Sequence, residues 1–332
     1  MCAPAPAGTA PHSVRGARAL GRWGTCRARP QGTHSARPAP VFPEPLYAPR
    51  DVKISVVIPC FNAEGTLHDA VRSALEAYEV LVVDDASPGG CAELVASWGW
   101  PNVRVIPHRE NLGLGAARNS GSAAATGDWI AFLDADDAFE DGWHRALTTF
   151  LHQSPEATWV YHPVREWTGT QLRAVRYGDH PTQHSDWLLL RPAVAPSACA
   201  LRADVAKTQP FDTNRRLQGT EDLELWMRLW AEGHRPLRWT DEAFTRYRIS
   251  HGMSAELESH TTKIRLRWAQ FVERGWIAEG VLVRAEFELQ RQKARSLHKA
   301  GRFAEAQRAY LAAGPSAKNW ILAAAAAVRL KI

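Results

Sequence analysis

Three short acidic segments stand out because each lies where the hydrophobic pattern ends a predicted strand or begins a predicted helix. They are Asp84-Asp85, Asp134-Ala135-Asp136-Asp137 and Glu221-Asp222. Carboxylates that crowd together repel one another unless a cation lies between them. Oxygen ligands suit Mn²⁺ or Mg²⁺, and a metal held by one or two carboxylates completes its shell with water and substrate phosphates. These residues therefore indicate a divalent cation and a nucleotide diphosphate as substrate.

Each acidic segment also has a structural interpretation. Asp134–Asp137 would suit the cap of a helix that begins near Gly142, since Asp is a favoured N-cap. Asp84-Asp85 would close a turn with Ser87, and Glu221-Asp222 would be ordinary acids in the first turn of a helix. The position of the first two segments directly after apolar strands favours the metal and substrate interpretation.

The elements that would position these segments alternate between strand and helix. Apolar strands are predicted at 54–58, 80–83, 103–106 and 129–133, and helices at 66–75, 91–98 and 114–125. Such alternation predicts an α/β fold of Rossmann-like type, with a mostly parallel sheet and helices on both faces. Ligands bind beyond the carboxyl ends of the strands in sheets of this kind, so the residues after each strand should share one rim.

The segments in their order resemble the family 2 glycosyltransferases of the GT-A fold. Similar to that family's conserved blocks are Ile54–Asn62, Val82–Ser87, Asn111–Gly113 with Ala117–Asn119, Gly127–Asp137 and Glu221-Asp222. The resemblance covers roughly residues 52–250. It implies the GT-A fold and an inverting, metal-assisted hexosyltransferase that uses a nucleotide-diphosphate sugar, with a UDP-sugar as the expected donor.

The resemblance also implies roles for individual residues. Those implied for donor binding are Pro59, Phe61, Asn62, Asp84, Asp85, Arg118 and Asp134. Asp84 and Asp85 would serve the nucleobase, and Arg118 would hold the donor phosphates or fix a loop. Those implied as ligands of Mn²⁺ or Mg²⁺ are Asp136, Asp137 and His251. Asp222 would be the catalytic base, with Glu221 beside it.

Two other functions stay open. A sugar nucleotidyltransferase shares a related sheet, but it would be expected to carry a Gly-rich, basic phosphate loop where this chain has Pro59–Glu64. An inactive, transferase-like scaffold protein would keep the fold without turnover, and the intact D-x-D triplet and Asp222 count against it. The acceptor, whether saccharide, lipid-linked or protein, is expected to be selected by loops within residues 160–220.

Three regions are predicted along the chain. Residues 1–50 form a disordered tail rich in Arg, Pro and Ala, residues 51–253 the GT-A domain, and residues 254–332 a helical C-terminal extension. Within the extension, residues 290–311 resemble one helical hairpin of the tetratricopeptide type. A single such repeat cannot bury its own apolar face, so it should pack on the main domain.

The net charge of +5 does not indicate a nucleic-acid partner. The first 50 residues hold seven Arg, no Lys and one Glu, which leaves the rest of the chain close to neutral. Five Cys without a C-x-x-C pair are typical of free thiols in a reducing compartment. The sequence shows no secretory or membrane-spanning run, which predicts a cytoplasmic protein and leaves peripheral membrane contact open.

Overall fold

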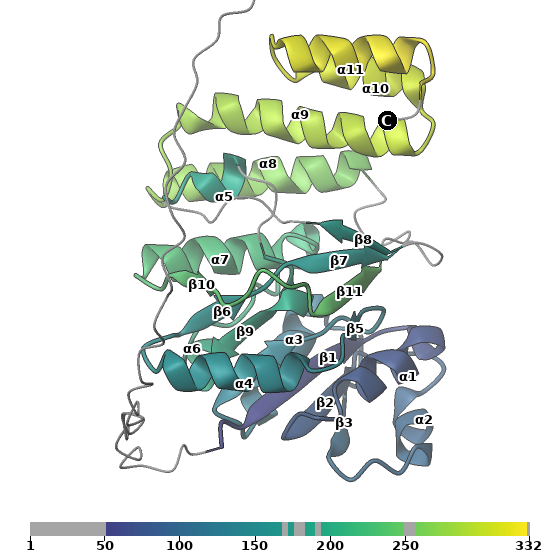
Figure 1. Cartoon of the computed structure of the whole chain (residues 1–332), viewed down its shortest axis with the longest axis vertical. Coiled ribbons are helices and arrows are strands. Elements are labelled where there is room, and N and C mark those ends of the chain that lie inside the picture. The colour runs from purple at the N-terminus through teal and green to yellow at the C-terminus, as the bar shows by residue number, and fades with distance from the viewer. Residues whose placement is uncertain (1–50, 168–171, 176–182, 190–193, 249–256, 331–332) are drawn as a thin grey trace, which may run out of the picture. The chain divides into compact units, whose positions relative to one another are not determined.

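The computed structural model describes residues 51–167, 172–175, 183–189, 194–248 and 257–330 (Figure 1). The predicted tail of residues 1–50 and the predicted ligand His251 lie outside these described residues. The division into a GT-A domain and an extension stays a prediction.

A seven-stranded sheet forms the centre of the molecule. Its strands run in the order β10-β6-β9-β4-β1-β2-β3. Their bounds are β1 Ile54–Cys60, β2 Glu79–Asp84, β3 Val103–Pro107, β4 Trp129–Phe132, β6 Trp159–Tyr161, β9 Cys199–Arg202 and β10 Pro236–Arg238. Every pairing is parallel except those of β9 with β4 and with β6. The predicted α/β class with a mostly parallel sheet is therefore confirmed.

Helices bury both faces of this sheet, and alternate residues of β1 show how. Val56 and Ile58 pack in one core with α1 (Glu64–Ser73), α2 (Cys91–Ser97) and α4 (Trp143–Gln153). Val57 packs in the other core with α3, α6 and α7. These three helices span Leu114–Ala124, Ala203–Thr208 and Glu221–Ala231. Successive side chains of a strand point to opposite faces, so a strand covered on both sides reads as a continuous apolar run.

A smaller sheet was not predicted. Its strand order is β5-β11-β7-β8, with bounds Ala138–Phe139, Thr245–Arg248, Val164–Trp167 and Leu172–Val175. β11 pairs antiparallel with β5 and parallel with β7. Because β5 follows the D-x-D segment directly, this sheet brings β11 beside Asp136 and Asp137.

Helices follow the two sheets toward the C-terminus. They are α8 Leu257–Glu273, α9 Val281–Lys299, α10 Phe303–Ala312 and α11 Ala317–Ala327. Trp268 and Phe271 of α8 and Leu289 of α9 belong to the same core as α7. The far end of α9 instead packs with α10 and α11 in a separate core, so these helices lie in successive layers (Figure 1).

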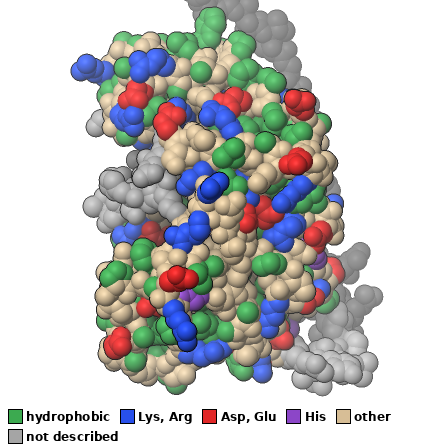
Figure 2. Space-filling model, turned by 180° about the vertical axis from the view of Figure 1, so that it is seen from behind, with side chains coloured by type: hydrophobic (Ala, Val, Ile, Leu, Met, Phe, Trp, Pro, Cys, Tyr) green, Lys and Arg blue, Asp and Glu red, His purple; other side chains and the backbone are tan. Residues whose placement is uncertain are grey.

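Two properties of the surface bear on partners. Within the described ranges, no helix combines the length and the apolar character needed to cross a bilayer. On the face drawn in Figure 2, Lys and Arg side chains alternate with Asp and Glu side chains. The described residues of that face therefore form no extended basic field of the kind that attracts a polyanion.

Candidate active site

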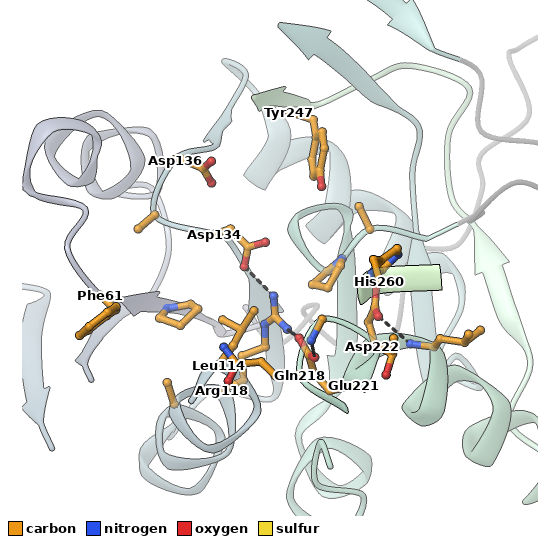
Figure 3. A pocket seen from close by; sticks show the side chains of 18 of the residues that line it. Phe61, Leu114, Arg118, Asp134, Asp136, Gln218, Glu221, Asp222, Tyr247 and His260 are labelled. Atoms are coloured by element: carbon orange, nitrogen blue, oxygen red, sulfur yellow. Dashed lines mark hydrogen bonds and ion pairs between the residues drawn. The ribbon is translucent and has the colours of Figure 1, made fainter. Parts of the chain in front are cut away.

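A cavity of about 800 Å³ lies at the carboxyl edge of the large sheet. The predicted residues that line it are Pro59, Phe61, Asn62, Asp85, Arg118, Asp134, Asp136, Glu221 and Asp222 (Figure 3). They come from the ends of β1 and β2, the segment after β4, α3 and the first turn of α7. Parallel strands end at the same edge of a sheet, and this brings segments far apart in the sequence to one site.

The loop after β1 forms one rim of the cavity. Phe61 is 47% exposed there, which leaves its ring free to contact a ligand. Asn62 has a φ of 52°, a left-handed conformation that turns the chain sharply away from the strand. Its backbone N–H donates to Ser87 Oγ over 3.1 Å, so the loops after β1 and β2 are tied together.

The two aspartates after β2 have different surroundings. Asp84 accepts hydrogen bonds from Ser87 N (2.9 Å) and Cys91 N (3.2 Å), and it is not among the residues that line the cavity. Both oxygens of Asp84 thus close the turn that leads into α2, and its expected contact with the donor stays a prediction.

Asp85 lines the cavity and also holds the loop before α3. It accepts from the backbone N–H groups of Leu112 and Gly113, each over 2.8 Å, and contacts His108 Nδ1 at 2.7 Å. The other ring nitrogen of His108 lies 2.9 Å from Ser120 Oγ. A carboxylate offers about four acceptor positions, so Asp85 retains one for a ligand.

Arg118 is fully buried and joins two of the acidic segments. Its Nη2 donates to Asp134 Oδ1 over 2.7 Å, and its Nη1 donates to Glu221 Oε1 over 3.0 Å. Burial alone would lower the pKa of Arg118, but the charges of Asp134 and Glu221 raise it above its ordinary value. Both terminal nitrogens of Arg118 are bound to carboxylates, which ties α3 to the D-x-D segment and to the start of α7.

Asp222 and Glu221 open α7 but have separate roles. Glu221 is buried, and it accepts from Arg118 and from the Gly219 N–H over 2.6 Å. Asp222 faces the cavity and accepts from the Leu223 N–H over 2.8 Å. Burial and the neighbouring Glu221 raise the pKa of Asp222 to about 6. A carboxyl group with such a pKa can take up a proton near neutral pH.

The D-x-D segment divides between cavity and core. Asp134 and Asp136 line the cavity, and burial together with the charge of Asp134 raises the pKa of Asp136. Asp137 is only 3% exposed and does not line the cavity, and its Oδ1 accepts from the Arg248 N–H over 2.7 Å. Asp137 anchors β11 through this bond, and its expected role as a metal ligand stays a prediction.

A divalent cation at this site would need ligands beyond the described side chains. Among the described residues, no three His, Cys, Asp or Glu side chains are grouped so that they could hold a metal ion by themselves. Asp134 and Asp136 nevertheless face one cavity, where burial and then the charge of Asp134 raise the pKa of Asp136. Two carboxylate ligands fit a cation whose shell is completed by substrate phosphates and water.

Sequence reasoning missed the residues that close the cavity opposite the sheet. They are Val194, Gln218, Leu223, Tyr247, Arg248, His260, Ile264, Trp268, Leu289 and Gln292, and they lie beside Trp187 and Trp226, which the sequence offered as residues that could stack on a sugar. Several belong to α8 and α9, whose apolar spacing predicts helices but does not show that one face meets a cavity. Trp226 is a core residue whose Nε1 donates to Val194 O over 3.1 Å.

Comparisons with known proteins indicate a glycosyltransferase family. Residues 55–208 match the family described as Glycosyl transferase family 2. The chain is 40% identical over 222 residues to an uncharacterized glycosyltransferase of Rickettsia conorii, over 65% of this chain and 36% of that protein. It is 43% identical over 88 residues to the succinoglycan biosynthesis protein ExoO of Rhizobium meliloti, over 25% of each. The chain thus spans between a quarter and two fifths of the length of these curated relatives.

Solved structures resemble the fold over a longer stretch. The structure of S. aureus TarS 1–349 in complex with UDP-GlcNAc has a TM-score of 0.58 and 17% sequence identity, over 83% of this chain and 88% of that one. The complex of the same protein with UDP has a TM-score of 0.51 and 18% identity, over 83% and 87%. At these identities the likeness concerns the fold.

Proposed function

This chain belongs to glycosyl transferase family 2, and we propose that it transfers a sugar from a UDP-sugar to an acceptor hydroxyl with inversion at the anomeric carbon. The observation that carries the proposal is the convergence of Asp85, Asp136 and Asp222, from three separate chain segments, on one cavity. The fold neighbour TarS, whose complexes hold UDP-GlcNAc and UDP, supports a uridine nucleotide as donor.

The donor would lie along the sheet edge. The loop of Pro59, Phe61 and Asn62 would flank the base and ribose, and the one acceptor position left on Asp85 would receive an N–H of the base. Asp134, fixed by Arg118, would face the sugar end of the donor. The ion pair costs little to maintain at the moment of reaction because it is already formed in the folded protein.

Asp136, with Asp134 beside it, would hold Mn²⁺ or Mg²⁺. When bound, the cation would offset negative charge on the departing diphosphate. The hypothesis requires these two side chains to reach the same cation, and Figure 3 draws both on the segment that follows β4, with Asp134 directed to Arg118.

Asp222 would act as the base in a single displacement. The acceptor oxygen forms a bond to the anomeric carbon while the bond from that carbon to the diphosphate oxygen breaks, and the hydroxyl proton passes to the carboxylate of Asp222. Attack on the face opposite the leaving group inverts the centre. A positioned general base typically contributes about 10²–10⁴-fold to the rate. Glu221 would position Asp222 through its bonds to Arg118 and Gly219.

A thermal-shift series with nucleoside diphosphates, with and without Mn²⁺, tests donor binding, since a ligand that binds only the folded state raises its melting temperature. The same samples are then incubated with UDP-sugars. We expect selective stabilisation by UDP and slow, Mn²⁺-stimulated release of UDP. Pyrophosphate-dependent exchange would instead identify a nucleotidyltransferase, and binding without any turnover would identify a scaffold.

A further inference from the structure

The cavity continues past Asp222 into a region that we name the apolar chamber. It is lined by Trp187, Val194, Leu223, Trp226, Ile264, Trp268 and Leu289, with Gln218, His260 and Gln292 as polar neighbours. All seven apolar side chains belong to one hydrophobic cluster or pack against it. The walls therefore come from α5 (Asp186–Leu189) and α7 and also from α8 and α9 of the C-terminal helices.

Charge is distributed unevenly along the cavity. Its two described cations are Arg118, which is bound to Asp134 and Glu221, and Arg248, whose Nε donates to Asp136 O over 3.0 Å. Arg248 also stacks on Trp167 at 4.1 Å, so it belongs to the D-x-D end. Among the described chamber residues defined above there is no Lys, Arg, Asp or Glu. Charges beside the chamber include Asp222, the ion pair of Glu221 with Arg118, and Lys263, whose Nζ donates to Gln218 O over 3.1 Å.

His260 does not change this charge balance. Burial lowers its pKa, and nearby Lys263 lowers it further, so its ring is neutral at pH 7. Figure 3 draws His260 on the same side of the cavity as Asp222. A neutral ring and two amides can orient a hydroxyl-bearing molecule by hydrogen bonds without attracting an anion.

We propose that the apolar chamber binds the acceptor, and that this acceptor is an uncharged molecule with an apolar group next to the hydroxyl that is glycosylated. The inference rests on the proposed function, because it takes Asp222 as the group to which that hydroxyl is presented. An acceptor whose hydroxyl reaches Asp222 has to place its remaining atoms against the chamber walls. Burial of apolar surface against these walls is favourable, whereas an anionic group there would lie near the carboxylate of Asp222 and would find no cation among the described residues that line the chamber.

Acceptor selection would then depend partly on the C-terminal helices. The sequence placed it within residues 160–220, and that region does supply Trp187 and Val194. The opposite wall is built by Ile264 and Trp268 of α8 and by Leu289 of α9. Residues 160–220 and the helices α8 and α9 thus both contribute to the described walls of the chamber.

Binding of three kinds of probe tests the inference. Octyl glycosides of glucose, galactose and N-acetylglucosamine, used below their micelle concentrations, are compared with the free sugars and the sugar 6-phosphates by titration calorimetry on the full chain with UDP and Mn²⁺. We expect at least one octyl glycoside to bind about tenfold or more tightly than its free sugar. The 6-phosphates should bind more weakly than either.

Two variants of one helix provide a matched pair. Ile264→Asn changes a chamber wall, and Leu266→Asn makes the same kind of change at a position of α8 that is 53% exposed and does not line the cavity. We expect Ile264→Asn to weaken the octyl glycoside by about tenfold and Leu266→Asn to leave it unchanged. The UDP titration of each variant verifies that the donor half is folded.

The outcomes separate this inference from the proposed function. Equal affinity for free sugar and octyl glycoside, preference for a 6-phosphate, absence of octyl glycoside binding, or equal effects of the two variants would each overturn the chamber assignment while UDP still binds. Failure of UDP to bind the unmodified chain would instead refute the donor site and the proposed function with it.

Discussion

The buried guanidinium of Arg118 on α3 lies 2.7 Å from the carboxylate of Asp134 at the end of β4. The same guanidinium forms a second ion pair with the carboxylate of Glu221 at the start of α7. Loss of one member of a buried ion pair leaves an uncompensated charge, which typically costs about 3–5 kcal/mol. We therefore expect Arg118→Ala to lower the free energy of unfolding by about that amount, measured by urea denaturation.

Arg202→Ala is the matched control for that experiment. Arg202 pairs with Asp204 over 2.7 Å, but the two side chains are 39% and 62% exposed. Exposed pairs contribute about 0–1 kcal/mol. If the two variants lost equal stability, the Arg118 bridge would not be a special feature of the site.

Asp222→Asn tests the base directly. The amide keeps the size of the carboxyl group but cannot accept the acceptor proton, so the rate of transfer should fall by about 10²–10⁴-fold. The dissociation constant of the donor should stay within about twofold, because Asp222 lies beyond the donor half of the cavity. Steady-state kinetics and a UDP titration measure the two quantities. A variant with normal turnover would remove Asp222 from the mechanism.

The pH dependence follows from the raised pKa of Asp222. The base is active only when deprotonated, and its pKa is about 6. Below that pH, kcat/KM should fall with the protonated fraction, by about tenfold per pH unit, and above it kcat/KM should level off. The residual activity of Asp222→Asn should lack this acidic limb. If kcat/KM of the variant still fell at acidic pH, another titrating group would be responsible for the fall.

The sequence predicted the strands of the parallel half with small errors at their ends, because they are continuous apolar runs. It also predicted that Asp85, Asp136 and Asp222 would face one cavity, since strand ends meet at one edge. It predicted short strands near Leu201 and over Phe244–Arg248, where β9 and β11 lie, but not their pairing, because their partner strands are distant in the chain. The sequence also did not show that Asp84 and Asp137 accept hydrogen bonds from backbone N–H groups, because adjacent carboxylates look alike in sequence.

Asp136 and Asp137 should respond differently to removal of the carboxylate charge. Asp136→Asn should raise the Mn²⁺ concentration needed for donor binding by about tenfold or more. In Asp137→Asn the metal response should persist, but the melting temperature should change because the hydrogen bond to the Arg248 backbone is altered. A Mn²⁺ titration of UDP binding, with chelator as the metal-free reference, measures the first effect. Equal metal responses would show that the cavity-facing position of Asp136 does not matter.

Gly121 tests how closely α3 must approach β1 to hold Arg118 in place. A Cβ atom built on Gly121 would lie 2.3 Å from Val57 Cγ1, and Val57 is itself fully buried. Such overpacking costs about 1–3 kcal/mol, so Gly121→Ala should destabilise the protein by that amount. Gly65→Ala is the control, because Gly65 is also helical but has no atom within 4 Å of the added carbon. The control should be neutral or stabilising by about 0.4–1 kcal/mol. If Gly121→Ala also lowers donor affinity while Gly65→Ala does not, the close packing of α3 on β1 positions the Arg118–Asp134 pair as well as stabilising the fold.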